Sequence, residues 1–181
     1  MPITIGAKKE SDFDDPIGML SDCHRRIERF LDVLARVAER GNLDGESRAA
    51  FEAALRYFRD AAPKHTADEE ESLFPRLRAL GDPALLGLLA QVDALEEDHV
   101  CANRKHEEVE RLGRRWLDEG ALSAEEMARL LEVLRQLQQL YSHHIAAEDR
   151  EIFPAAKAAL QAADCQAIGG EMAARRGVRR E

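Results

Sequence analysis

The feature that most constrains this chain is a histidine and a glutamate four residues apart, followed by Phe-Pro, which occurs twice. The two copies have the same internal spacing and comprise His65, Glu69 and Phe74-Pro75, then His144, Glu148 and Phe153-Pro154. Residues four apart lie on one face of an α-helix, one turn from each other. The repeat therefore predicts two helices that direct metal ligands at a common centre.

Apolar residues recur at spacings of three and four along four long segments, which is the pattern of amphipathic helices. His24 interrupts the first of these apolar stripes and His99 interrupts the third, while the two His-Glu pairs interrupt the second and fourth. Four long helices with short connections predict an all-α, antiparallel up-down-up-down four-helix bundle. A short C-terminal helical extension is expected to follow it.

Local signals divide the chain into an N-terminal arm (residues 1–13), the bundle (14–162) and a C-terminal tail (163–181). Asp-Pro at residues 15–16 and 82–83 and the Ser123–Glu126 capping box predict helix starts. Pro63 predicts a kink around residues 59–63, and Pro75 is expected to end or bend its helix.

Composition narrows the function classes. A chain of 181 residues forms one domain with a sizeable core, and 45% hydrophobic, 34% charged and 5% aromatic residues suit a helical bundle. The net charge of −9 argues against nucleic-acid binding, and no apolar run is long enough to span a membrane. Charged residues close to the start argue against a signal peptide, and three scattered cysteines argue against a disulfide framework. We expect a cytoplasmic monomer or weak homodimer.

Six polar residues are predicted to face the core of the bundle at one level, namely His24, His65, Glu69, His99, His144 and Glu148. The plainer interpretation is that six unrelated polar residues interrupt apolar stripes, but burying them without a counter-charge is costly. A metal cation removes that cost. Imidazole and carboxylate donors without thiolate favour iron over manganese or zinc, and two carboxylates among four imidazoles suggest two bridged cations.

This order and spacing of residues resembles the hemerythrin-like (HHE cation-binding) family over residues 14–160, in its four-histidine, two-glutamate bacterial form. The resemblance implies a four-helix bundle that holds a non-heme di-iron centre, with an oxo or hydroxo bridge, and that meets dioxygen, peroxide or nitric oxide. It also implies that the four histidines are terminal iron ligands and that Glu69 and Glu148 bridge the two irons.

One departure from the oxygen-carrying members concerns the third helix, where those proteins have a His-x-x-x-His pair. Here the residues four before and four after His99 are Leu95 and Asn103, so a fifth histidine is missing. Four further residues are candidates for an outer layer around the centre: Tyr141, Glu96, Asn103 and His106. Three of them also have a plainer interpretation, with Tyr141 and His106 as core packing and Glu96 as a solvated neighbour of the stripe, while Asn103 is expected to hydrogen-bond a bound ligand.

Two function classes stay open from the sequence. One is an enzyme that handles peroxide or nitric oxide or repairs iron centres, in oxidative or nitrosative stress or iron homeostasis. The other is a protein that binds dioxygen or nitric oxide reversibly, senses them or stores iron, without turnover. A third hypothesis, a purely structural bundle, predicts no bound metal. No individual residue is assigned a catalytic role.

Overall fold

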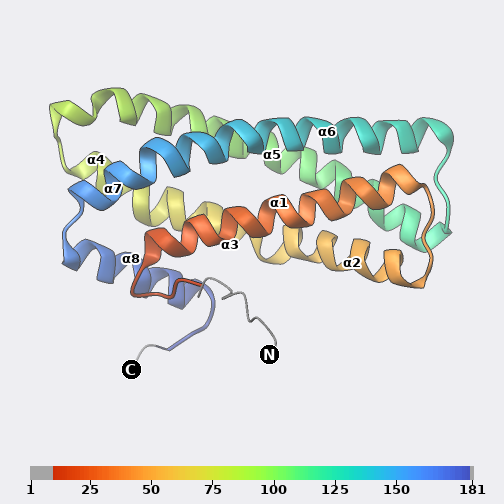
Figure 1. Cartoon of the computed structure of the whole chain (residues 1–181), viewed down its shortest axis with the longest axis horizontal. Coiled ribbons are helices and arrows are strands. Elements are labelled where there is room, and N and C mark those ends of the chain that lie inside the picture. The colour runs from red at the N-terminus through yellow and green to blue at the C-terminus, as the bar shows by residue number, and fades with distance from the viewer. Residues whose placement is uncertain (1–9, 180–181) are drawn as a thin grey trace, which may run out of the picture.

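A computed structural model describes residues 10–179, so most of the predicted arm over residues 1–13 lies outside the described part. Within that part every regular element is helical (Figure 1). The α-helices are α1 (Pro16–Arg40), α2 (Gly45–Asp60), α3 (Ala62–Asp68), α4 (Phe74–Ala79), α5 (Leu86–Glu119), α6 (Ala124–Ala147), α7 (Phe153–Ala159) and α8 (Ala162–Arg175). Two π-helical turns, η1 (Glu69–Leu73) and η3 (Glu148–Ile152), and one 3-10 turn, η2 (Pro83–Leu85), complete the set.

The predicted helix starts are confirmed by their caps. The Asp15 side chain accepts a hydrogen bond from the Gly18 amide at 3.0 Å, directly before Pro16 at the first helical position. The Asp82 side chain accepts from the Ala84 amide in the same way. Ser123 and Glu126 form both hydrogen bonds of a capping box at the start of α6.

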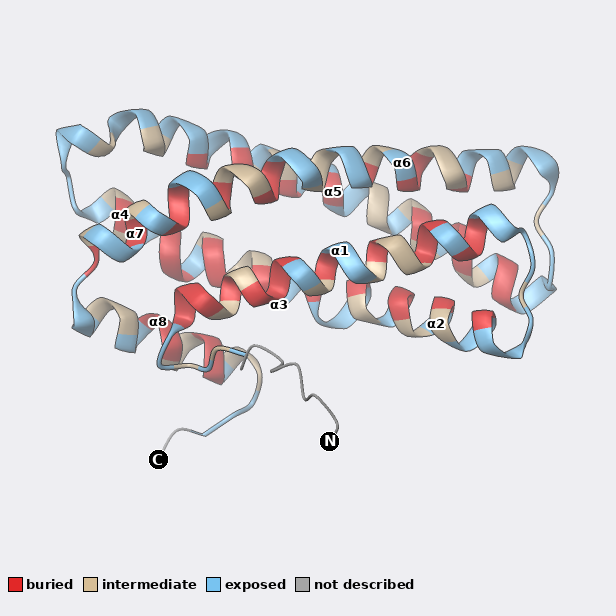
Figure 2. Ribbon diagram, in the orientation of Figure 1, coloured by how far each residue is buried: buried red, intermediate tan, exposed pale blue. Residues whose placement is uncertain are grey.

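The helices lie side by side along the long axis of the molecule and bury their apolar faces against one another (Figure 2). Their buried side chains form two separate apolar clusters, one containing Ile27 and Trp116 and the other containing Leu20 and Phe153. On α1, His24 falls between Leu20 of one cluster and Ile27 of the other. A polar layer at the level of His24 therefore separates two apolar cores.

The second long helical segment is interrupted near Pro63, as the sequence predicted: α2 ends at Asp60, and α3 begins at Ala62. Pro75 does not end its helix, since α4 continues to Ala79. Each Phe-Pro is instead preceded by a π-turn that begins at the repeated glutamate. In both turns the phenylalanine amide donates to the glutamate carbonyl five residues earlier, Phe74 to Glu69 and Phe153 to Glu148.

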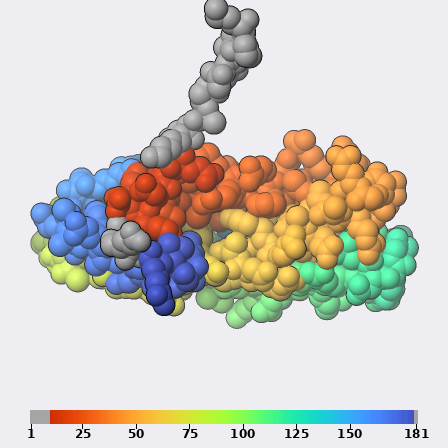
Figure 3. Space-filling model, turned by 90° about the horizontal axis from the view of Figure 1, so that it is seen from below, coloured from red at the N-terminus to blue at the C-terminus, as the bar shows by residue number. Residues whose placement is uncertain are grey.

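The C-terminal helix α8 packs across α1, α3 and η1, and Figure 3 shows it in dark blue beside the red start of α1 and the yellow α3 segment. Its last turn is tied to Asp68, which is fully buried, by Arg175 at 2.9 Å and Arg176 at 2.6 Å. The expected helical extension is thus a helix attached directly to the segment that carries His65 and Glu69.

None of the helices within residues 10–179 combines the length and the apolar character that a membrane crossing requires.

Candidate metal centre

The polar layer contains the six residues that the sequence singled out, and all of them are at most 5% exposed. His24 comes from α1, His65 and Glu69 from the α3–η1 junction, His99 from α5, and His144 and Glu148 from the α6–η3 junction. Each glutamate is the first residue of a π-turn, four residues after its histidine, so both side chains of a pair reach the interior. The structure therefore brings residues from four separate stretches of sequence to one place.

The six residues divide into two overlapping groups of four, each with ligand atoms within 4.8 Å of one another. The first group joins His24 and His65, and the second joins His99 and His144; Glu69 and Glu148 belong to both groups. Within the first group His24 Nε2 lies 3.0 Å from Glu148 Oε2, and His65 Nε2 lies 3.2 Å from Glu69 Oε1. Each group therefore offers two imidazole nitrogens and two shared carboxylates.

The second group has matching distances. His99 Nε2 lies 3.4 Å from Glu69 Oε2, and His144 Nε2 lies 3.3 Å from Glu148 Oε2. One contact is longer, with His24 Nε2 at 3.8 Å from Glu69 Oε1. The Nε2 atoms of all four imidazoles thus point at the two carboxylates in the middle.

These donors fit a cation better than they fit one another. Within residues 10–179, the four carboxylate oxygens of Glu69 and Glu148 and the Nε2 atoms of His24 and His144 are buried without a hydrogen-bond partner. Their separations are those of ion pairs, yet no hydrogen bond satisfies these atoms. Buried polar atoms that converge without pairing are costly unless a metal ion satisfies them.

The electrostatic state of the groups agrees with this geometry. Burial alone would lower the pKa of His24, but Asp149, Glu148 and Glu69 raise it well above its ordinary value. The pKa of His99 is raised to about 9 in the same way, against the effect of burial, chiefly by Glu69. Burial would raise the pKa of Glu69, but His65, His24 and His99 hold it well below the ordinary value. The Glu69 carboxylate therefore stays ionised, and a metal ion that binds here would displace the protons that the raised pKa values retain on His24 and His99.

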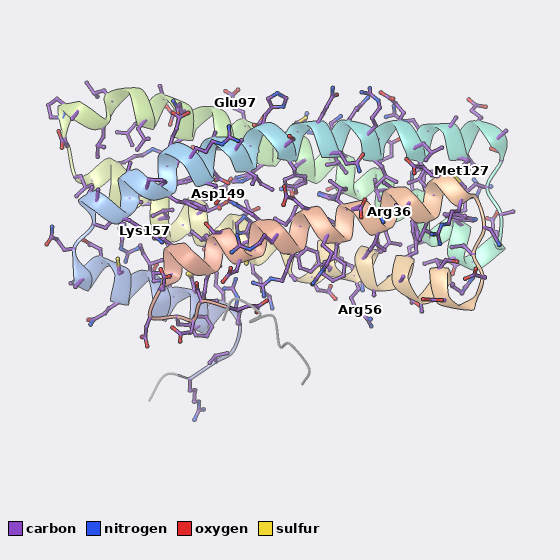
Figure 4. The ribbon with its side chains drawn as sticks, in the orientation of Figure 1. Arg36, Arg56, Glu97, Met127, Asp149 and Lys157 are labelled. Atoms are coloured by element: carbon purple, nitrogen blue, oxygen red, sulfur yellow. The ribbon has the colours of Figure 1, made fainter. Side chains whose placement is uncertain are left out.

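An outer layer of carboxylates, which sequence reasoning missed, orients three of the four imidazoles. His24 Nδ1 lies 3.1 Å from Asp149 Oδ1, His99 Nδ1 lies 2.8 Å from Glu70 Oε1, and His144 Nδ1 lies 3.5 Å from Asp98 Oδ2. Asp149, labelled in Figure 4, also accepts a hydrogen bond from the Ser21 hydroxyl of α1. When Nδ1 carries the proton that these carboxylates attract, Nε2 is left free to bind a metal.

A signal for two of these carboxylates was present in the sequence. Glu70 directly follows Glu69, and Asp149 directly follows Glu148, so the repeat includes a second acidic residue at the same position. Each reaches across to the histidine of a different helix, Glu70 to α5 and Asp149 to α1.

His65 is the exception among the four imidazoles. Its Nδ1 is buried without a hydrogen-bond partner among the described residues. Glu69, with a smaller contribution from the Cys23 sulfur, raises the pKa of His65 against the effect of burial. Cys23 is buried, and its sulfur accepts a hydrogen bond from Arg26 Nη2 at 3.1 Å.

The four outer-layer candidates from the sequence lie in different surroundings. Tyr141 is close to the centre, where it lines the cavity described next, and its hydroxyl lies 3.0 Å from His106 Nε2. His106 itself stacks on Phe58 and does not reach the six residues. Glu96 forms a two-pronged ion pair with Arg78, and Asn103 is exposed.

A small cavity of about 10 Å³ adjoins the centre, and we call it the inner cavity. The histidines of the centre form one side of it, and its other walls are Ile27, Ala62, Thr66, Tyr141 and Ile145. A space of this size holds about one water molecule. The centre is therefore enclosed, with room for a very small ligand on the side that Tyr141 lines.

Comparison with known proteins agrees with the site. An uncharacterized protein of Haemophilus influenzae is 29% identical over 170 residues, which cover 92% of this chain and 93% of that protein. The family model described as the hemerythrin HHE cation binding domain matches residues 15–156, a span that includes all six inward-facing residues. The chain belongs to the hemerythrin HHE cation-binding family.

Proposed function

We propose that this protein holds two iron ions between its four histidines and two glutamates, and binds or reacts with dioxygen, peroxide or nitric oxide there. The observation that carries the proposal is the pair of overlapping donor groups, in which Glu69 and Glu148 are shared and their buried oxygens have no hydrogen-bond partner in the described part of the chain. Two ions that share two carboxylates satisfy all of these atoms at once.

Nitrogen and oxygen donors without thiolate favour iron over zinc, with manganese as the nearest alternative. When bound, such a pair of ions supplies electrons and open coordination positions for small oxidants. The protein supplies the rest. Asp149, Glu70 and Asp98 hold three of the imidazoles in orientation, and Ile27, Ala62 and Ile145 form apolar walls of the adjoining cavity.

The choice between reaction and reversible binding depends on two features of the site. The two donor groups are alike, with two histidines each, which supports a centre at which both ions are reachable and reaction with peroxide or nitric oxide follows. The inner cavity, at about 10 Å³, is small and enclosed, which supports the alternative of reversible dioxygen or nitric oxide binding, sensing or iron storage without turnover.

The test is metal analysis of the purified full-length protein together with its visible spectrum under nitrogen, air, peroxide and nitric oxide. We expect two irons per chain and a charge-transfer band from an oxo or hydroxo bridge. Repeated consumption of peroxide or nitric oxide would establish an enzyme, and a stable, reversible oxygenated spectrum would establish a carrier. A native protein without metal would overturn the proposal.

Four further expectations belong to the same proposal. We interpret the helices as an antiparallel up-down-up-down four-helix bundle over residues 14–162 with α8 as an extension. The chain is expected to be a monomer or weak homodimer in the cytoplasm, without nucleic-acid partners. Gel filtration tests the oligomeric state, and cell fractionation tests the location.

A further inference from the structure

A second and larger cavity of about 330 Å³, which we call the outer cavity, lies between helices α1, α2, α3 and α5. Its floor consists of buried apolar side chains: Leu34, Leu55, Phe58 and Val109. Its rim carries exposed polar residues, among them Arg59, Asn103 and Glu107. The outer cavity thus opens at the surface and has an apolar base.

Two side chains separate the outer cavity from the inner cavity. His106 lines the outer cavity, Tyr141 lines the inner cavity, and the Tyr141 hydroxyl lies 3.0 Å from His106 Nε2. The His106 ring also stacks on Phe58, with ring centroids 4.3 Å apart and planes at 21°. Neighbouring residues repeat this division, because Ala62 lines the inner cavity and Pro63 the outer cavity.

The His106 ring is held by few polar contacts. Its Nδ1 is buried without a hydrogen-bond partner among the described residues, so the contact with Tyr141 is its one side-chain hydrogen bond there. Burial lowers the pKa of His106 to about 4, so the imidazole is neutral near pH 7 and has no ion pair to hold it. A neutral ring with one hydrogen bond and one stacking contact can turn at a modest cost.

We infer that the outer cavity collects small uncharged molecules and that the His106–Tyr141 pair is the partition through which they reach the inner cavity. What happens to them afterwards rests on the proposed function, but the route does not. The apolar floor favours uncharged molecules, and the rim adds little net charge, because Arg59 donates to Glu110 there at 2.9 Å. The inner cavity has room for about one water molecule, so it limits passage to the smallest molecules, such as dioxygen or nitric oxide.

The test uses Asn103→Trp, which places an indole over the mouth of the outer cavity from an exposed position on α5. Arg104→Trp is the matched control, because Arg104 is exposed next to it but lines a different surface groove. Asn103→Phe serves if the indole is not tolerated. His106→Ala is the opposite change, since it removes the partition.

The first readout is relaxation of methyl NMR signals by dissolved dioxygen, measured on the full-length chain with zinc and again without added metal. We expect enhancement at Leu55 and Val109 of the outer cavity and at Ile27 and Ile145 of the inner cavity. Asn103→Trp should abolish the enhancement at all four residues, Arg104→Trp should leave it unchanged, and His106→Ala should increase it at Ile27 and Ile145. Unchanged enhancement at Ile27 and Ile145 in Asn103→Trp would overturn the inference.

The second readout is the rate of nitric oxide association with the iron-loaded protein. Asn103→Trp should slow it about tenfold, equivalent to about 1.4 kcal/mol on the barrier, and Arg104→Trp should not change it. An equal rate in the Asn103→Trp variant and the wild type would count against the route. If the protein binds no iron, the proposed function fails alone, because the dioxygen relaxation measurement still decides the route.

Discussion

The two copies of the repeat, α3–η1–α4 and α6–η3–α7, supply the same ligands in the same order but are supported differently. In both, a histidine is followed by a glutamate that opens a π-turn, and Phe-Pro begins the next helix. The residue three positions before the histidine is Ala62 in the first copy and Tyr141 in the second. The repeat therefore determines which atoms reach the centre and supplies Glu70 and Asp149 as orienting carboxylates, while the unrepeated residues give each copy a different further support.

The first copy is tied from outside by the C-terminal helix. Asp68, directly before Glu69, is fully buried between Arg175 and Arg176, whereas the residue before Glu148 is Ala147, which packs against apolar neighbours. The second copy is instead connected inward, through Tyr141 to His106. The first ligand pair is thus tied to α8 by ion pairs, and the second is connected to α5 through Tyr141 and His106.

The largest expected effect is the loss of metal binding when one of the two shared carboxylates is replaced. Because Glu69 and Glu148 each belong to both donor groups, Glu69→Gln and Glu148→Gln should each remove both ions and weaken metal affinity by about 100-fold or more. Metal analysis after dialysis measures this, with the exposed Glu151→Gln as the control. If Glu148→Gln kept one ion while Glu69→Gln lost both, the two carboxylates would not be equivalent.

The next largest effect concerns the stability that the ion pairs of Asp68 with Arg175 and Arg176 give to the first copy. Replacing both Arg175 and Arg176 with alanine leaves the Asp68 carboxylate buried without a cation, which should lower the free energy of unfolding by about 3 kcal/mol. Denaturant unfolding measures the loss, and adding Asp68→Asn should restore part of it. Arg150→Ala, at an exposed position of the second copy, should change stability little. A double variant as stable as the wild type would show that α8 contributes no support.

The outer carboxylates allow a finer comparison among the four histidines. Glu70→Gln and Asp149→Asn should each weaken metal binding by about 10- to 100-fold, because His99 and His24 lose the groups that fix their tautomers. Asp98→Asn should have less effect, since its contact with His144 is longer, at 3.5 Å. Competition with a chelator measures the affinities. Equal losses from all three variants would contradict a role graded by distance.

The smallest expected effect is a pH dependence of stability caused by His106, the residue that contacts the Tyr141 hydroxyl. The folded-state pKa of His106, about 4, lies below its ordinary value of 6.5, so the unfolded chain takes up a proton at a higher pH than the folded chain. Stability from this group is complete above pH 6.5 and decreases as the pH falls toward 4, by between about 1 and 2 kcal/mol near pH 5.

His106→Gln should remove this part of the pH dependence, and unfolding curves at a series of pH values measure it. The exposed His143→Gln is the control, and the slope should persist there. An unchanged slope in His106→Gln would mean that another group is responsible.

Much of the centre was predictable because ligand positions obey helical spacing. His24 and His99 were identified from their places in apolar stripes, and His65 and His144 from their glutamates four residues later. The helix starts and the break near Pro63 follow from local chemistry and were predicted for that reason. The structure places all six inward-facing residues together, while metal binding by them stays a prediction.

The missed features depend on tertiary packing. Whether Asp98 or Glu96 faces a histidine depends on the rotation of α5, which the spacing alone did not determine. The ties from Arg175 and Arg176 to Asp68 join residues more than a hundred positions apart, which no local pattern reveals. The π-turns were missed because a Pro after Phe predicts a helix end as readily as a widened turn.

Each π-turn changes the direction in which the side chains after the glutamate point. An ordinary helix rotates by about 100° per residue, so the direction of one side chain dictates the direction of every later one. A π-turn absorbs one additional residue, and Phe74 and Phe153 then meet the apolar core although Glu69 and Glu148 have already turned inward. The phase of the ligand-bearing helices and the phase of the helices after them are set independently.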